Sequence, residues 1–249
     1  MRFMQWSLQH QILYASLILF GLVLIAAGGW FLFFYTPDSC SDGAQNQNEE
    51  GIDCGGVCAL LCEAPNVSAT WARSVRVAPG VYHAVAMVRN SDAGAGTTNL
   101  PYTFSLYDAD NLLIATKKGL ATLEPGEVVP IFEKNVITGE RVPVRTFIDF
   151  EGGTWFKMER IESPIRITSQ SLDQNNLRLT ASVENKTPSA VENIILTALL
   201  YDADDVLVAA SQTVINTLQA RGTQTVTFTW QEAFERPVVR TDIVPRVER

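Results

Sequence analysis

The longest apolar run of the chain occupies residues 11–35, with the sequence QILYASLILFGLVLIAAGGWFLFFY and no charged residue. As an α-helix, this run would extend about 37 Å, which exceeds the roughly 30 Å hydrocarbon core of a bilayer. A cleaved signal peptide has a shorter apolar core that ends at a small-residue site. Here the hydrophobic character continues beyond Ala26-Ala27-Gly28-Gly29 into an aromatic segment. The pattern therefore predicts an uncleaved transmembrane helix that holds the chain in a lipid bilayer.

From residue 68 onward the pattern changes to short runs of Val, Thr, Leu and Ile separated by turn residues, which is typical of β-strands. In the first half of this region we expect strands near residues 74–77, 81–89, 102–107, 112–117, 127–135 and 144–150. Asp108-Ala-Asp-Asn111 has the composition of a hairpin turn. The pattern predicts antiparallel strands joined by tight turns.

The same pattern occurs twice, with an offset of about 95 residues. Val88-Arg-Asn90 returns as Val183-Glu-Asn185, and Leu106-Tyr-Asp-Ala-Asp110 returns as Leu200-Tyr-Asp-Ala-Asp204. Glu140-Arg141 likewise returns as Glu235-Arg236. Such matches in one register indicate two copies of one domain.

Short antiparallel strands at this spacing predict immunoglobulin-like β-sandwiches. The predicted fold class is therefore an all-β ectodomain with two antiparallel β-sandwiches in tandem, after one transmembrane helix and a short disulfide-linked segment. We expect a cytoplasmic tail at 1–10, the transmembrane helix at 11–35 and a cysteine-rich module at 36–66. The first sandwich is expected at 67–152, a linker at 153–163 and the second sandwich at 164–249.

The charges around the helix predict its orientation. Arg2 precedes it, whereas Asp38, Asp42, Glu49, Glu50 and Asp53 follow it, and no Lys or Arg occurs again before Arg73. Because positive charge is retained on the cytoplasmic side, the N-terminus is expected in the cytoplasm and the remaining chain outside it. The predicted location is a cell membrane, crossed once.

Composition excludes one class of partner. Beyond Arg2 the chain has 18 Lys and Arg against 27 Asp and Glu, and it has no basic patch. Nucleic-acid binding proteins concentrate basic residues on one face. We therefore expect no nucleic-acid partner.

All four cysteines lie in one short stretch, at Cys40, Cys54, Cys58 and Cys62. An even number of cysteines in an exported segment favours two disulfides, with three pairings open. A zinc site with four thiolates is the alternative. The C-x13-C-x3-C-x3-C spacing lacks paired C-x-x-C knuckles, so disulfides are favoured over zinc.

This stretch resembles a cysteine module of exported proteins, C-x-D-G-x-x-N-x-x-E-x-G-x-D-C-G-G-x-C. The resemblance implies an extracytoplasmic location. Its oxygen-bearing side chains offer hard ligands that suit calcium, and the candidate ligands are Asp42, Asn46, Glu49 and Asp53. The spacing is not that of an EF-hand loop. A solvated acidic turn closed by disulfides is the alternative, so calcium is the one cofactor that the sequence suggests.

The repeated domain resembles the FxLYD family. Phe104-Ser-Leu106-Tyr107-Asp108 carries that motif in full, and the second copy has Leu200-Tyr201-Asp202 with Ala198 at the Phe position. The resemblance implies exported modules typical of bacterial surface proteins or lipoproteins, and it brings no catalytic residues. By strand alternation, Phe104 and Leu106 are expected to face the core, with Tyr107 and Asp108 at the strand end.

Candidate catalytic chemistry is sparse. Aligning the copies places His83 opposite Arg178, on the outer face of a strand, where a Ser-His-Asp site is not expected. The pairs Asp108/Asp110 and Asp202/Asp204 are better explained as turn residues than as acid–base pairs. Three tryptophans are candidates for a sugar-stacking platform, although filling a core or a domain junction is the commoner role; they are Trp71, Trp155 and Trp230.

The sequence thus favours a non-enzymatic single-pass membrane protein whose sandwiches act as a spacer and a protein-interaction module, with protein partners in the cell envelope. Two alternatives remain open. One is a subunit of an envelope secretion or pilus-type assembly, for which a single N-terminal span and a periplasmic β region are a frequent plan. The other is a hydrolase of wall polymers.

Overall fold

A computed structural model describes residues 2–34, 39–46 and 48–247 of the 249-residue chain. The chain divides into two compact units, Met1–Gly56 and Val57–Arg249, and each is described on its own. The first unit holds one long helix and an acidic loop, and the second holds all of the β-strands.

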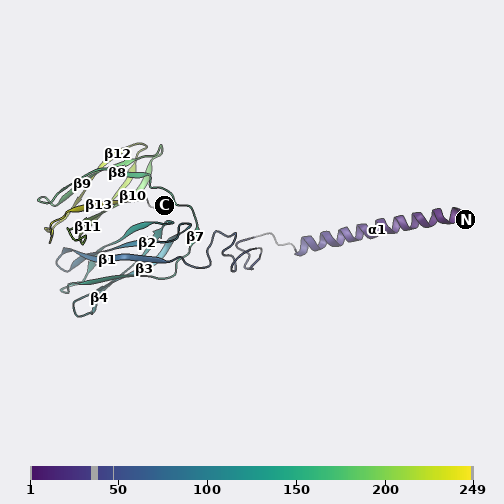
Figure 1. Ribbon diagram of the computed structural model, residues 1–249, viewed down its shortest axis with the longest axis horizontal. Coiled ribbons are helices and arrows are strands. Elements are labelled where there is room, and N and C mark those ends of the chain that lie inside the picture. Colours follow the sequence, from purple (N-terminus) through teal and green to yellow (C-terminus); the bar gives the residue numbers. More distant parts are fainter. Residues whose placement is uncertain (1, 35–38, 47, 248–249) are drawn as a thin grey trace. The chain divides into compact units, whose positions relative to one another are not determined.

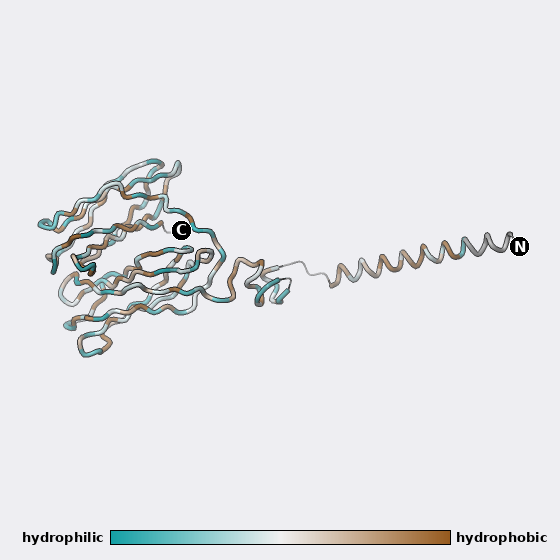
Figure 2. The backbone as a smooth tube through the Cα atoms, in the orientation of Figure 1, coloured by the Kyte–Doolittle hydropathy of each residue, from teal (hydrophilic) through white to brown (hydrophobic). Residues whose placement is uncertain are grey.

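The helix α1 extends over Arg2–Phe34 (Figure 1). Its segment His10–Phe34 is 25 residues long, has a mean hydropathy of 2.5 and is not buried against any other part of the described chain. It is the one helix among the described residues that is long and apolar enough to cross a membrane, and Figure 2 shows its hydrophobic character. Of the sequence expectations here, Tyr35 and Asp38 lie outside the described residues.

The first sandwich pairs two antiparallel sheets (Figure 1). One sheet has the order β1-β2-β5, with bounds Val67–Ala78, Val81–Asn90 and Val128–Ile137. The other has the order β4-β3-β6, with bounds Leu113–Leu123, Ala95–Tyr107 and Arg145–Phe150. Alternate side chains from both sheets enter one core, in which Phe104, Leu106 and Val88 have no exposed surface.

The second sandwich repeats this plan. The sheet β12-β9-β8 has bounds Thr223–Thr229, Arg178–Asn185 and Ile165–Asp173. The sheet β11-β10-β13 has bounds Leu207–Leu218, Val191–Tyr201 and Arg240–Val247. Leu179, Leu196 and Leu200 are fully buried in the core between them. The prediction of two antiparallel sandwiches is thus confirmed.

The six strands predicted for the first copy all occur, and the differences lie at their ends. Strand β1 begins at Val67 and β3 at Ala95, both several residues before the predicted starts. In β3 the early start passes through Gly96 and Asn99, residues that strands disfavour. Pairing with β4, from Thr97 opposite Leu123 onward, supplies the extra strand residues with ladder partners.

The segment between the sandwiches also contains a short strand, β7 (Phe156–Lys157), which pairs with the start of β3. On its other side β7 receives the chain that precedes β1. The Leu61 N–H donates to the carbonyl of Trp155 at 2.8 Å, and the Lys157 N–H donates to the carbonyl of Ala59 at 2.7 Å. Leu61 packs on the first core. Residues 59–61 are therefore attached to the first sandwich by backbone hydrogen bonds.

The two sandwiches pack sheet against sheet. A third apolar cluster joins Val75 and Val85 of the first copy to Leu199, Tyr201 and Leu207 of the second. The sheet β1-β2-β5 therefore faces the sheet β11-β10-β13, and the four sheets stack as successive layers (Figure 1). We call this contact the junction. The outer layers are β4-β3-β6 and β12-β9-β8.

Candidate functional site

The hairpin after β3 is organised by the carboxylate of Asp108, the last residue of the Phe104–Asp108 motif. Its Oδ1 accepts hydrogen bonds from the backbone N–H groups of Asp110 at 3.0 Å and Leu112 at 2.9 Å. Its Oδ2 accepts from Nη1 of Arg141 at 2.7 Å. These bonds, the one from Leu112 foremost, lower the pKa of Asp108. The carboxylate therefore stabilises the turn.

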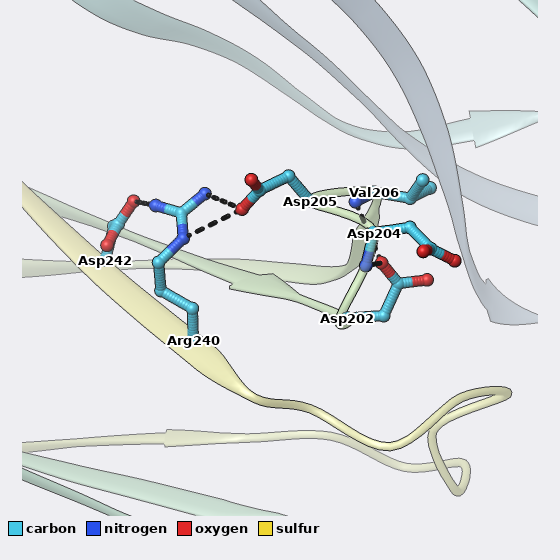
Figure 3. Close-up of polar contacts among 6 residues, drawn as sticks. All are labelled: Asp202, Asp204, Asp205, Val206, Arg240 and Asp242. Atoms are coloured by element: carbon cyan, nitrogen blue, oxygen red, sulfur yellow. Dashed lines mark hydrogen bonds and ion pairs between the residues drawn. The ribbon is translucent and has the colours of Figure 1, made fainter.

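Asp202 has the same role in the second copy. Its Oδ1 accepts from the N–H groups of Asp204 and Val206, at 3.0 and 2.9 Å (Figure 3). Its Oδ2 accepts from Nη1 of Arg236 at 2.8 Å, and this hydrogen bond is the main cause of the lowered pKa of Asp202. The repeated Glu-Arg of the sequence thus supplies the cation for the repeated Asp. Asp108 and Asp202 serve as turn residues, as the sequence indicated.

Beside this hairpin, Arg240 forms a network that the first copy lacks (Figure 3). Its guanidinium bonds to Asp205, with Nη2 at 3.1 Å from Oδ1, and also to Asp242. It lies over the ring of Tyr201, 3.9 Å from the centroid, in a cation–π contact. Burial raises the pKa of the Tyr201 hydroxyl.

Asn90 and its counterpart Asn185 are buried, and their side chains hold neighbouring loops by hydrogen bonds. Asn90 is 1% exposed, and its Nδ2 donates to the carbonyls of Ala95 at 2.7 Å and Glu124 at 2.9 Å. Asn185 in the second copy donates to the carbonyls of Ser189 and Leu218. Buried backbone carbonyls need donors, so the repeated Asn is explained by loop closure.

The junction is where the two copies differ. Strand β10 of the second copy presents Leu199 to the first copy, and in β3 the register of strand pairing places Ser105 at the same position. Ala210, which pairs with Leu199, corresponds to Thr116, which pairs with Ser105. Two residues earlier on the central strands, Val244 pairs with Thr197 and corresponds to Asp149, which pairs with Thr103. At these positions the face of the second copy that meets the first is apolar where the free face of the first copy is polar, whereas Phe147 of the first copy corresponds to Asp242 of the second.

The same comparison holds for the other sheet. Trp71 and Met87, which pair across β1 and β2, correspond to Ser169 and Ser182 across β8 and β9. Val75 corresponds likewise to Asp173. At these six positions, apolar side chains on the two junction faces stand where the corresponding free faces have polar ones. These apolar residues therefore allow one sandwich to pack on the other.

Next to the junction the layers separate and leave a cleft of about 1280 Å³. Its walls come from β5 and β13 and its floor from residues 158–165, which join the sandwiches. Both wall strands are sheet edges and each carries a proline, Pro130 or Pro245. Since proline lacks the N–H that a ladder needs, these edges are blunted against pairing with a further strand.

Polar contacts also tie the sandwiches together. Nη2 of Arg246 on β13 donates to the carbonyl of Thr122 on β4. Nε of Arg76 on β1 lies 3.5 Å from Oε2 of Glu232. Both contacts are exposed, so they orient the two sandwiches more than they stabilise them.

His83 lies on the face of β2 that points away from the first core, beside Phe132 with 4.9 Å between ring centroids. Its Nδ1 accepts a hydrogen bond from the Asn135 N–H at 3.3 Å. Burial and the charge of Lys134 lower its pKa to about 4. His83 is thus a neutral packing residue, in agreement with its predicted place outside a pocket.

The three candidate tryptophans lie in three different places. Trp71 belongs to the junction. Trp155 is 2% exposed within the first core. Trp230 packs on the second core beside Phe234, and its Nε1 donates to the carbonyl of Ala210 at 3.3 Å. The alternative of one sugar-stacking platform is wrong, and the roles in cores and at a junction are confirmed.

The cysteine prediction is confirmed in its main point. Cys40, Cys54, Cys58 and Cys62 are all disulfide-bonded, and no free cysteine occurs. A zinc site of four thiolates is therefore excluded, because a sulfur in a disulfide is not a thiolate ligand.

The proposed calcium ligands lie in the acidic loop of the first unit, where they accept hydrogen bonds from the loop itself. Oδ1 of Asp53 accepts from the Asp42 N–H at 3.0 Å, and Oδ2 accepts from the Gly43 N–H at 3.0 Å. Oε2 of Glu49 accepts from the N–H groups of Asn46 and Asp53. Nδ2 of Asn46 donates to Asp42 at 2.8 Å. Calcium binding stays a prediction, and loop closure is the observed use of these oxygens.

Sequence reasoning placed the repeated Asp, Asn and Arg correctly in register but did not find the junction. The sequence did contain a sign of the junction. Residues 194–201 of β10 (IILTALLY) are almost all apolar, whereas apolar and polar residues alternate in residues 102–107 of β3 (YTFSLY). A strand that is apolar on both faces is buried on both faces. Leu199, Leu200 and Tyr201 of β10 are accordingly all buried.

Comparisons with known proteins add little. No protein-family model matches the chain, and no significant match was found among curated proteins. Among solved structures, red sea bream transglutaminase matches 74% of this chain and 29% of its own, at 13% identity and a TM-score of 0.25. A β-glucuronidase of glycoside hydrolase family 2 matches 65% of this chain and 24% of its own, at 11% identity and a TM-score of 0.17. The chain thus spans less than a third of either protein.

Proposed function

We propose that this chain is a non-enzymatic, single-pass membrane protein whose two sandwiches form one rigid extracytoplasmic module for protein interaction. The observation that carries the proposal is the junction. Tandem domains joined only by a linker move independently. Here an apolar cluster of Val75, Val85, Leu199, Tyr201 and Leu207 joins the sandwiches. A partner would therefore meet one composite surface, with the cleft beside the junction as part of it.

Two features support the membrane anchor and the compartment. The apolar segment His10–Phe34 has the length and hydropathy of a spanning helix. All four cysteines are oxidised, and disulfides persist in compartments outside the cytoplasm. The resemblance of the repeats to FxLYD domains, which are exported modules, agrees with this compartment. The sandwiches would then act as a spacer and docking module above the bilayer.

The non-enzymatic role is supported by how the candidate catalytic groups are used. Asp108 and Asp202 close turns and pair with arginines. His83 accepts a backbone hydrogen bond and has a pKa of about 4. General acid–base catalysis needs a group with a matched pKa that reaches the substrate. Each of these side chains is instead engaged in the fold.

Membrane anchoring is tested on whole cells that produce the full chain. The protein should stay in the membrane fraction after alkaline extraction, and its N-terminal peptide should be detected intact by mass spectrometry. Protease added outside the cytoplasmic membrane should digest the sandwiches. Loss of residues 1–30 from the mature protein would show a cleaved signal, and protection of the sandwiches would show the opposite orientation.

Rigidity of the module is tested by distance measurements between the sandwiches. Because the native cysteines are disulfide-bonded, cysteines introduced at Thr116 and Thr225 can be spin-labelled selectively in the full chain. These positions lie on the outer faces of the first and second copies. Labelled chains are diluted with excess unlabelled wild type, which removes distances between copies. A single narrow distance distribution is then expected, and a broad one would contradict a rigid module.

A further inference from the structure

We propose that the outer face of the sheet β4-β3-β6 is the surface on which a second copy of this chain docks. The two faces would pack sheet to sheet about a twofold axis parallel to the strands. This inference goes beyond the proposed function, because it assigns a surface that neither the junction nor the cleft uses.

One end of this face carries an exposed aromatic and aliphatic patch. Tyr107 and Phe147 meet edge to face with 5.7 Å between ring centroids. Phe147 is 53% exposed and Leu113, the cross-strand neighbour of Tyr107, is 47% exposed. Leu112 and Val144 are also exposed beside them. Exposed apolar side chains that cluster on one surface, with polar residues around them, are typical of interaction surfaces.

The second copy shows what such an end does in this fold. Strand register places Tyr201 and Leu207 at the positions of Tyr107 and Leu113. Tyr201 and Leu207 are buried, and their cover is the sheet β1-β2-β5 of the first copy. The same end of the same sheet is therefore a sheet-docking position in one copy and is uncovered in the other.

The centre of the face carries opposite charges on its two edge strands. Lys118 on β4 and Asp149 on β6 both pair with Thr103 of the central strand, so the three lie in one row. Both charged side chains are exposed, and among the described residues neither has an ion-pair partner. A twofold axis along the strands lays β4 of one copy over β6 of the other. Lys118 then faces Asp149 of the second copy, twice in each dimer.

The other sheet faces are less suited to binding a second copy. The face of β1-β2-β5 is already covered by the second sandwich. The outer face of β12-β9-β8 is made of short polar side chains and charges, among them Ser169, Asp173, Thr180, Thr225 and Thr227. A self-complementary contact of β4-β3-β6 is therefore favoured. Such a contact closes on itself, which gives a dimer and not a filament.

Charge reversal tests the proposal directly. The full chain in mild detergent should sediment as a concentration-dependent dimer. Lys118→Glu or Asp149→Lys alone should weaken the dimer about tenfold or more, because each creates two like-charge contacts per dimer. The double variant Lys118→Glu/Asp149→Lys should recover the wild-type affinity. Arg178→Glu on the outer face of β9 is the matched control and should leave the dimer unchanged.

A symmetric cross-link gives a second, independent measurement. Ser105 lies on the central strand β3 in the row of Phe147 and Thr116, so a cysteine there would face its own copy across the axis. Ser105→Cys should form a disulfide-linked dimer, whereas Ser182→Cys on β9 should not. Phe147→Ser should reduce dimerisation while the chain keeps its fold, measured by circular dichroism of the monomer. A chain that stays monomeric, or a double charge variant that stays as weak as the single ones, overturns the proposal.

Discussion

Trp71 and Tyr201 meet edge to face across the junction, with 6.3 Å between ring centroids and ring planes at 85°. Trp71 belongs to β1 of the first sandwich and Tyr201 to β10 of the second. The other side of the contact is closed by Arg240, whose guanidinium lies over the Tyr201 ring. One aromatic pair with a cation thus links the two sandwiches.

Replacing Trp71 with Ala should separate the unfolding of the two sandwiches. The variant loses the edge contact and leaves a cavity beside Tyr201, at an expected cost of about 2 kcal/mol. Calorimetry of the wild-type chain should show the sandwiches melting in one cooperative transition. The Trp71→Ala chain should show two transitions, because the contact that couples the sandwiches is reduced.

The control for this change is Ser169→Ala, at the corresponding position of the second copy. Ser169 is exposed on an outer face, so its replacement should leave the transition unchanged. If Trp71→Ala melts in one transition at the wild-type temperature, the junction does not couple the sandwiches.

Short runs of strand-forming residues between turn sequences made the six strands of the first sandwich predictable. Phe104 and Leu106 were placed in the core by alternation, and both are fully buried. The junction was harder to predict because it depends on differences between the copies, such as Leu199 against Ser105. Strand β7 is only two residues long, which leaves no periodic pattern to recognise.

The site was predictable only where a local rule applies. Asp is favoured in turns because its side chain accepts hydrogen bonds from the backbone that follows, so the role of Asp202 followed from the sequence. Its partner Arg236 is 34 residues away, and only the fold brings the two side chains to 2.8 Å. The stacking of Arg240 on Tyr201 depends on strand register in the same way.

Asp202→Asn and Asp202→Ala should separate the two tasks of this carboxylate. Asn keeps an oxygen that accepts from the N–H groups of Asp204 and Val206, but it loses the ion pair with Arg236. Ala loses both. We therefore expect the melting temperature to fall in the order wild type, Asn, Ala. Thermal unfolding followed by circular dichroism provides the measurement.

The pH dependence of these variants gives a further check. Because the folded state lowers the pKa of Asp202, its contribution is present above the unfolded value near 4 and is lost as the pH falls below it. Asp202→Asn should therefore differ from the wild type at pH 7 and converge with it in acid. Asp204→Asn, whose side chain accepts none of these turn hydrogen bonds, is the control. A constant difference at all pH values would argue against the ion pair.

His83 should make the protein less stable in mild acid. Its pKa is about 4 in the folded state against about 6.5 when unfolded, so the unfolded chain binds the extra proton first. Stability from this group is therefore intact above pH 6.5 and falls as the pH drops to about 4, by at most about 3 kcal/mol. Urea unfolding of the wild type and of His83→Gln between pH 7 and 4 should show a steeper loss for the wild type.

Gln is chosen because its side-chain oxygen can accept the hydrogen bond that Asn135 donates to His83. Carboxylates titrate in both proteins, so the informative quantity is the difference between the two curves. Equal slopes would mean that His83 is protonated as readily in the folded chain as in the unfolded one.

Gly56→Ala should prevent the acidic loop of the first unit from closing, and with it the formation of the disulfides. The backbone of Gly56 has a φ of +53°, and a Cβ there would lie 1.5 Å from the carbonyl oxygen of Asn48. A backbone atom cannot yield as a flexible side chain can, so the loop has to open. The expected result is incomplete disulfide formation, measured as free thiols by alkylation and mass spectrometry of the unreduced full chain.

Gly43→Ala is the matched control, because it separates backbone strain from a steric clash. Gly43 also has a positive φ, of +74°, but a Cβ there would meet nothing within 4 Å. Strain alone costs about 1 kcal/mol, which the loop should tolerate, so all four cysteines of Gly43→Ala should remain oxidised. Equal thiol yields from the two variants would show that the close approach of Gly56 to Asn48 does not control the closure of the loop.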